Sequence, residues 1–328
     1  NRSMATPQTQ PRAEVVVRPL AENELAQADM MVRVAFGTFL GMPDPSAFMG
    51  DANYAHTRWN ADPSAALAAL LDGKLVGTSF ATVWGSFGFF GPLTVAPEYW
   101  GHGIAQQLIA PTMEILRASG IRHAGLYTFA NSPKHMALYQ KFGFWPRDLV
   151  VNMIKPVGDV PPQMPPDTSR FNDAKIEDRA QFLAACREVT DANFEGLDVS
   201  REIRAVAEQK LGNTILVWDG SSLAAFAVCH TGPRSEAGTG VCYAKFAAVR
   251  PGPRAVENLK RLLDAVEAFA RCAWAHKITA GVNVARRETY LALVAHGFRG
   301  DSQGVAMESD DESAGYNRAG VFILDDWR

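Results

Sequence analysis

The sequence lacks the marks of several large protein classes. No run approaches the roughly 20 apolar residues of a membrane-spanning helix, and the most hydrophobic stretch, 85–95, is interrupted by glycines and Pro92. Lysine and arginine total 32 against 35 aspartates and glutamates, a net charge of −3, which argues against a protein that mainly neutralises nucleic-acid phosphates. Residues 1–14 are polar, without the apolar segment of a secretory leader. We therefore expect a cytoplasmic protein that binds neither membranes nor nucleic acids.

Cysteines and metal-binding motifs are also scarce. The four cysteines form no C-x-x-C pair, and the seven histidines form no H-E-x-x-H motif. This usage predicts reduced, buried cysteines and excludes a disulfide framework or a zinc site. We therefore expect no metal in the chemistry. The cysteines all lie in the second half of the chain: Cys186, Cys229, Cys242 and Cys272.

A proline-rich stretch divides the chain in two. Five prolines fall within 156–167, a density typical of an extended connector. The 328 residues fit two domains at about 150 residues each. We therefore predict domains over 14–156 and 168–328, joined by a linker over 157–167.

The two halves predict the same order of elements. Each contains a hairpin whose turn is Asp-Gly, at Asp72-Gly73 and Asp219-Gly220, a strong hairpin signal between apolar runs. In the first half we expect strands over 14–20, 66–71, 75–84, 88–95, 124–129 and 149–155, and helices over 22–37, within 45–60, and over 101–119 and 133–142. In the second half we expect strands near Arg170 and over 214–218, 223–230, 241–249, 278–284, 304–307 and 320–324, and helices over 176–189, 200–210, 255–276 and 286–295.

The spacing of matching residues supports an internal duplication. From Pro97 to Gly143 is 46 positions, and from Pro251 to Gly297 is also 46, with phenylalanine after each glycine. Adjacent antiparallel strands followed by a strand–helix–strand unit predict an α/β (α+β) fold. Each half would be a mixed, mostly antiparallel sheet flanked by helices.

A glycine-containing loop joins the strand ending at Val95 to the next helix. Gly101 and Gly103 let backbone approach a ligand closely, and the first N–H groups of the helix are a suitable site for a pyrophosphate. A plain helix-starting turn explains the glycines equally well. A dinucleotide site fits poorly, because six residues separate Val95 from Gly101 and Gln106 stands at the third glycine position.

Two motifs in order give this loop a specific context. Val95-x-Pro97 followed by Trp100-Gly-His-Gly-Ile-Ala105 resembles the acetyl-CoA loop of the GNAT superfamily of N-acetyltransferases, with Trp100 where that family usually has arginine or glutamine. The segment from Asn131 through Tyr139 to Gly143-Phe144 resembles the family's second signature. The resemblance covers the first half nearly completely.

The resemblance implies an N-acetyltransferase with acetyl-CoA as co-substrate and two GNAT-like domains in tandem. The strands ending at Val95 and near Phe129 would part, and the pantetheine arm would lie between them. An amine would attack the thioester directly, with backbone N–H near Leu93 stabilising the oxyanion and Tyr139 as general acid. The residues implied in coenzyme binding are Leu93, Thr94, Val95, Trp100, Gly101, His102, Gly103, Ile104, Ala105 and Asn131.

Alternatives remain open for the residues around this site. The motif match favours the acid role of Tyr139, and the alternative is a core aromatic, because Met136, Tyr139 and Phe142 follow helical spacing. The acceptor is expected to be a small-molecule or peptide amine. Strands 78–95 contain no carboxylate or histidine to serve as general base; the charged or titratable loop residues considered for that role are Glu98, Asp51 and His56.

The second half departs from the motif where the coenzyme would bind. An offset of 154 places Ala255 at Gly101, Glu257 at Gly103 and Leu293 at Tyr139. Glu257 would repel a pyrophosphate. We therefore expect a degenerate repeat that shapes the acceptor site or imitates a dimer partner, in a chain that is a monomeric pseudo-dimer or a homodimer. The alternative function is a non-catalytic acyl-CoA-binding sensor or assembly protein.

Overall fold

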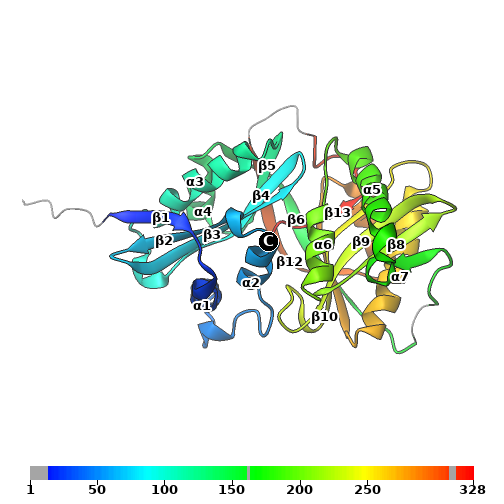
Figure 1. Cartoon of the computed structure of the whole chain (residues 1–328), viewed down its shortest axis with the longest axis horizontal. Helices are drawn as coiled ribbons and strands as arrows, with labels where there is room; N and C mark the ends of the chain where they lie inside the picture. The colour runs from blue at the N-terminus through cyan, green and yellow to red at the C-terminus, as the bar shows by residue number, and fades with distance from the viewer. Residues whose placement is uncertain (1–13, 161–162, 310–314) are drawn as a thin grey trace, which may run out of the picture.

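The protein forms two lobes joined by one continuous β-sheet (Figure 1). The structure is a computed structural model that describes residues 14–160, 163–309 and 315–328. The strand order is β1-β2-β3-β4-β5-β12-β6-β11-β10-β9-β8-β7, and β13 pairs with β10 outside this path. The expected fold of mixed, mostly antiparallel sheets flanked by helices is confirmed.

The first lobe follows the predicted order of elements. Asp72 and Gly73 have φ values of 50° and 74°, as the tight turn of a twisted hairpin requires. The serine before Pro133 caps its helix by accepting a hydrogen bond from the His135 backbone. The elements are β1 (Val15–Pro19), α1 (Leu25–Phe39), α2 (Ala55–Ala61), β2 (Ala66–Leu71), β3 (Lys74–Trp84), β4 (Phe87–Val95), α3 (Ile104–Ala118), β5 (His123–Thr128), α4 (Pro133–Gln140) and β6 (Phe144–Pro156).

The second lobe repeats the pattern, with one additional short strand near its end. The segment expected as a strand over 320–324 pairs only at Ile323–Leu324, whereas the strand expected over 304–307 is longer than predicted. The elements are β7 (Thr168–Arg170), α5 (Ile176–Asn193), α6 (Ser200–Glu208), β8 (Gly212–Asp219), β9 (Ser222–Gly232), β10 (Gly238–Val249), α7 (Ala255–Cys272), β11 (Lys277–Asn283), α8 (Arg287–Ala295), β12 (Arg299–Ser309) and β13 (Ile323–Leu324).

The halves exchange strands at the centre of the sheet. β6 of the first half pairs with β11 of the second over residues 150–156 and 277–283. β12 of the second half pairs with β5 of the first over 305–308 and 125–128. β6 and β12 also pair with each other. Backbone hydrogen bonds therefore join the lobes, a feature that the sequence pattern did not predict.

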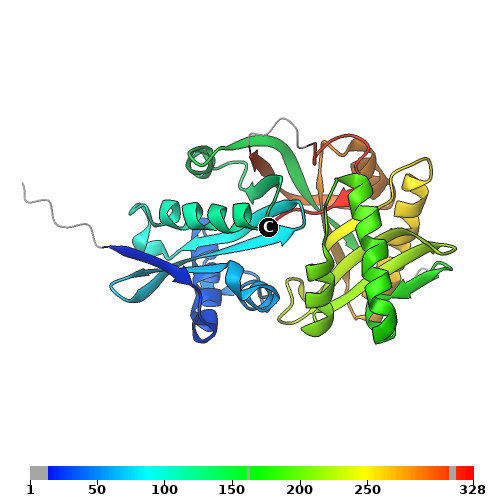
Figure 2. The same cartoon turned by 45° about the horizontal axis from the view of Figure 1, so that its top comes forward.

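Helices cover both faces of each lobe, and the core lies between them and the sheet (Figure 2). In the first lobe one apolar cluster joins α1 to Phe80 of β3, and others join α3 to β2 and to β5. In the second lobe α5 and α6 enclose one cluster and α7 and α8 enclose another. Apolar burial on both faces makes the shared sheet a rigid frame.

Other sequence expectations concern the cysteines, the linker, membrane-spanning helices and metal ligands. All four cysteines are free, and three are buried, but the expectation of burial is wrong for Cys272, because it is exposed at the end of α7. Residues 161 and 162 of the predicted linker lie outside the described residues. No helix among the described residues is both long and apolar enough to cross a membrane. Nor do the described residues group three or more potential metal ligands.

Candidate active site

Strands β4 and β5 run parallel and then part. They pair only over Phe87–Phe89 and His123–Gly125, although β4 continues to Val95 and β5 to Thr128. We call this divergence the first fork. Within the described residues no strand pairs with β4 beyond Phe89 on the side of β5, so its backbone edge there is free of strand partners. The divergence lies where the sequence motifs predict it.

A β-bulge shapes β4 at the first fork. Phe90 and Leu93 of β4 pair with Ala81 and Ser79 of β3, so β4 has one more residue than β3 between these two pairs. Gly91 and Pro92 therefore interrupt the ladder. Gly91 has a φ of 152°, a conformation that strongly favours glycine. Its carbonyl accepts a hydrogen bond from the Arg58 guanidinium. The bulge is therefore fixed by a side chain from α2.

The glycine loop leads from β4 to the start of α3. Gly101 and Gly103 have φ values of 84° and 77°, and a side chain at either would meet nothing within 4 Å. Gly103 is the N-cap of α3, and no side chain caps the helix. The first N–H groups of α3 therefore keep hydrogen-bonding capacity for an anion.

The other predicted loop residues hold the loop in place or contribute backbone. The Trp100 indole donates a 2.7 Å hydrogen bond to the Val95 carbonyl, and His102 Nδ1 lies 3.1 Å from the Tyr99 carbonyl. The Ile104 side chain is buried in the core. At the helix start, Ile104 therefore offers a ligand only its backbone, as does the neighbouring half-buried Ala105.

The remaining predicted residues flank the first fork. Leu93 is half-buried and Thr94 is buried, with the Thr94 hydroxyl lacking a partner. Asn131 is exposed in the turn after β5. Tyr139 is buried, and its ring lies 5.9 Å from that of Phe90 in an edge contact.

Burial also governs the ionisation of Tyr139. Desolvation raises the pKa of its phenol well above the ordinary value, so the side chain carries its proton at neutral pH. Phe90 directly precedes the bulge. The ring contact with Phe90 therefore places the Tyr139 ring, from α4, beside β4 at the first fork. The packing suits both a proton donor and a core aromatic.

The corresponding divergence in the second half, the second fork, is occupied by the chain itself. β10 and β11 pair over Val241–Ala244 and Lys277–Ala280, and beyond that point β13 pairs with Ala247 and Ala248 of β10. The Val249 N–H donates to the Phe322 carbonyl at 2.9 Å. By the 154-residue offset these β10 residues correspond to 93–95. The edge that the first fork leaves free is therefore already paired.

Further contacts hold this segment in the second fork. The fully buried Arg286, at the start of α8, donates to the Ile323 carbonyl at 2.9 Å and to the Asp325 carboxylate at 2.7 Å.

At the start of α7, Glu257 pairs with Arg254 at 3.2 Å, and this partner lowers the pKa of the Glu257 carboxyl. A carboxylate thus stands where the first half has Gly103.

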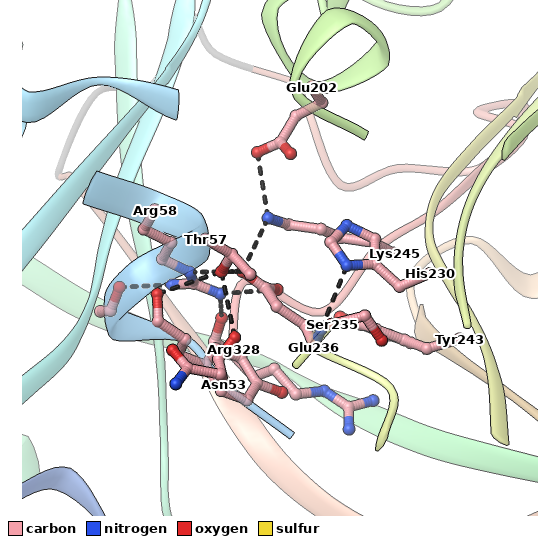
Figure 3. Close-up of polar contacts among 12 residues, drawn as sticks. Asn53, Thr57, Arg58, Glu202, His230, Ser235, Glu236, Tyr243, Lys245 and Arg328 are labelled. Carbon is pink, nitrogen blue, oxygen red and sulfur yellow. Dashed lines mark hydrogen bonds and ion pairs between the residues drawn. The ribbon is translucent and has the colours of Figure 1, made fainter. Parts of the chain in front are cut away.

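A chain of buried charges crosses the seam between the halves (Figure 3). Arg58 Nε lies 3.0 Å from Glu236 Oε1, Lys245 Nζ lies 3.2 Å from the same oxygen, and Lys245 Nζ lies 3.1 Å from Glu202 Oε1. Burial tends to raise the pKa of Glu236, but the charges of Arg58 and Lys245 outweigh it and hold the pKa far below its usual range. The carboxylate stays ionised.

His230 lies beside this chain of charges. Its Nδ1 accepts a 3.2 Å hydrogen bond from the Glu236 backbone N–H, while Nε2 is buried without a partner. Burial lowers the pKa of His230 to about 4, so the ring is neutral at pH 7. Sequence reasoning missed this group, since nothing in the local pattern joins α2 to β9 and β10. The only hint was charged and polar residues within apolar strands.

The three side chains considered as general base have other surroundings. Asp51 accepts hydrogen bonds from the backbone N–H and hydroxyl of Thr239, at 2.8 and 2.5 Å, and so joins the halves. His56 Nδ1 lies 3.1 Å from Asn53 Oδ1. Glu98 is exposed in the loop after β4. The two glutamates in the chain of buried charges, Glu202 and Glu236, are both engaged with Lys245.

Comparisons with known proteins agree with this geometry. Residues 35–144 match the sequence model of the Acetyltransferase (GNAT) family. A putative acetyltransferase from Pyrococcus horikoshii is 13% identical with a TM-score of 0.66, and the match covers 98% of this chain and 97% of that one. A tandem GNAT protein from the clavulanic acid biosynthesis pathway is 14% identical with a TM-score of 0.53, over 90% and 98% of the two chains.

A third similar structure contains a long-chain acyl-CoA and not acetyl-CoA. The Saccharomyces cerevisiae N-myristoyltransferase with bound myristoyl-CoA is 14% identical with a TM-score of 0.63, and the match covers 97% of this chain and 87% of that one. No curated protein sequence matches the chain. The family match supports acyl transfer from an acyl-CoA to an amine. The match to the acetyltransferase (GNAT) family thus covers residues 35–144, and the whole chain has the fold of two GNAT-like domains in tandem.

Proposed function

We propose that the protein is an N-acetyltransferase with one working coenzyme site, at the first fork. Residues 14–156 would form the acetyl-CoA-binding domain and residues 168–328 the degenerate one. One observation carries the proposal: the free edge of β4 leads directly into an uncapped helix start with two open glycines. The β4 edge suits the amides of a pantetheine arm, and the helix start suits a diphosphate.

The chemistry needs few groups from the protein. The acceptor nitrogen attacks the thioester carbonyl carbon, a C–N bond forms, and the C–S bond breaks. The backbone N–H of Leu93, just after the bulge, would stabilise the negative charge that develops on the carbonyl oxygen. Tyr139 would donate its proton to the departing sulfur and recover one from solvent. The amine's own proton would leave to water.

The acetyl group and the amine acceptor belong to this proposal. The fold accommodates different acyl donors, as the myristoyl-CoA complex of a similar structure indicates. The sequence resemblance favours acetyl-CoA because the first half carries the acetyl-CoA loop motif. For the acceptor we propose a small-molecule or peptide amine that approaches from the seam, opposite the glycine loop.

Thiol release from acyl-CoA tests the proposal. The purified chain would be incubated with acetyl-CoA or myristoyl-CoA and a panel of small amines, aminoglycosides and peptides with free amino termini. We expect amine-dependent release with acetyl-CoA for at least one acceptor. Tight coenzyme A binding without release from any pair would instead support the sensor function, and absence of binding would contradict both.

A further inference from the structure

Arg58 connects the first fork to the second half of the chain. Its Nη1 donates to the Gly91 carbonyl in the β4 bulge, and its Nη2 donates to the Arg328 carbonyl. Its Nε donates to Glu236 Oε1 at 3.0 Å, and Nη2 lies 3.3 Å from Glu236 Oε2. The guanidinium carbon, Cζ, also lies over the Tyr54 ring, 4.9 Å from its centroid. Four groups from separate parts of the chain therefore fix this one side chain.

Glu236 is the ion-pair partner that allows the Arg58 guanidinium to be buried in its charged form. The side chains of Arg58 and Glu236 are 3% and 0% exposed, and a buried charge left without its partner is strongly destabilising. The Thr57 hydroxyl donates to Glu236 at 3.1 Å, and Lys245 reaches the same carboxylate. Both of these groups contact Oε1, while Arg58 contacts Oε1 and Oε2. Because the carboxylate is held in this way, the guanidinium plane can turn very little.

We propose that Arg58 and Glu236 are positioning residues for acyl transfer, so the second half helps to build a site that lies in the first. The inference rests on the proposed function. Gly91 begins the bulge and Leu93 follows it, so the hydrogen bond to the Gly91 carbonyl sets the direction of the Leu93 N–H. A displacement of about 1 Å at such a donor can cost roughly 100-fold in rate.

Holding the lobes together is a separate role, and the backbone pairing of β6 with β11 and of β12 with β5 performs it. An exposed ion pair joins Arg122, just before β5, to Glu195 after α5, with an N–O distance of 2.8 Å. The side chain of Glu195 is 81% exposed. Exposed pairs of this kind contribute little to stability. Glu195→Gln is therefore a matched control for Glu236→Gln: both remove one carboxylate from an ion pair between the halves, but only Glu236 acts on the bulge.

The experiment compares these two variants with Arg58→Lys and the double variant Arg58→Met/Glu236→Met. The double variant removes one buried charge of each sign and leaves Lys245 paired with Glu202, which favours folding. The readouts are kcat and KM for acetyl-CoA with the best acceptor from the panel, the melting temperature, and amide hydrogen exchange of the segment 87–95.

We expect Glu236→Gln, Arg58→Lys and the double variant to lose about 10- to 100-fold in kcat, with KM for acetyl-CoA changed less than about threefold. Lysine keeps the charge but lacks the planar fork that reaches all four partners. Exchange within 87–95 should become faster in these three variants. Glu195→Gln should behave as the wild type does.

Two results would overturn the inference. One is recovery of kcat in a well-folded double variant, which would mean that the pair serves folding alone. The other is unchanged exchange within 87–95 in Glu236→Gln. If the wild type transfers no acyl group, the proposed function fails, while the exchange measurement still decides whether the pair positions the bulge.

Discussion

The two forks have the same backbone framework but differ in what pairs with the diverging strand. In each, parallel strands pair for three or four residues and then part, beside a helix whose start faces the opening. At the first fork the β4 edge beyond Phe89 has no strand partner on that side among the described residues. At the second, β13 lies on β10 and Phe322 accepts the hydrogen bond of Val249. The diverging strand edge thus lacks a strand partner in one copy and is paired with its own chain in the other.

This difference matches the proposal that the second half is a degenerate repeat that folds without a ligand. The segment around Ile323 supplies the backbone partners that a bound ligand would otherwise provide, so the β10 edge is satisfied without coenzyme. The segment then continues to Trp327, which packs against Phe87, a β4 residue of the first fork. Under the proposed function, this half therefore contributes packing at the first fork and not a coenzyme site of its own.

The largest expected effect compares two tyrosines on equivalent helices, Tyr139 on α4 and Tyr290 on α8. Tyr139→Phe removes only a hydroxyl, and kcat should fall about 100-fold because the leaving thiolate loses its acid. Tyr290→Phe should leave kcat unchanged. Steady-state kinetics with acetyl-CoA and the best acceptor provide the measurement. Full activity of Tyr139→Phe would show that this side chain is only a core aromatic.

The next effect concerns the charge difference between the two helix starts. Gly103→Asp introduces the carboxylate that Glu257 places at the second fork, and Gly103→Asn is its neutral control of nearly equal size. Both residues tolerate positive φ. Repulsion between like charges should weaken coenzyme A binding by roughly 2 kcal/mol, about 30-fold, in the aspartate variant relative to the asparagine variant. Isothermal titration calorimetry measures the ratio, and equal affinities would place the diphosphate elsewhere.

The smallest expected effect is on stability and comes from His230, which lies at the seam and not at either fork. Burial depresses the pKa of His230 to about 4 from an ordinary 6.5, so the unfolded chain binds a proton before the folded one does. Stability should therefore fall as the pH drops from 7 to 5, by about 1 to 2 kcal/mol from this group. Urea unfolding at the two pH values measures the loss. His230→Gln should flatten this dependence, and an unchanged slope would contradict the assignment.

The sequence predicted local structure well and long-range pairing poorly. The Asp72-Gly73 and Asp219-Gly220 hairpins and the helix after Gly103 follow from turn chemistry and periodicity, which act over a few residues. The strand exchange of β6 and β12 did not follow, because a period-2 pattern identifies a strand without naming its neighbour.

The same limit applies to the candidate site. The loop motif indicated Gly101 and Gly103 because those residues are adjacent in the chain. The contact between Arg58 and Glu236 spans 178 positions, and no local pattern marks either residue. A strand was expected over 320–324, but its place on β10 was not, although that place explains why the second fork differs from the first.

A crystal structure of the chain with coenzyme A tests the central claim most directly. We predict one coenzyme per chain, with its pantetheine between β4 and β5, its diphosphate at the start of α3, and residues 322–324 still paired with β10. An empty first fork, or a second coenzyme that displaces those residues from β10, would contradict the account.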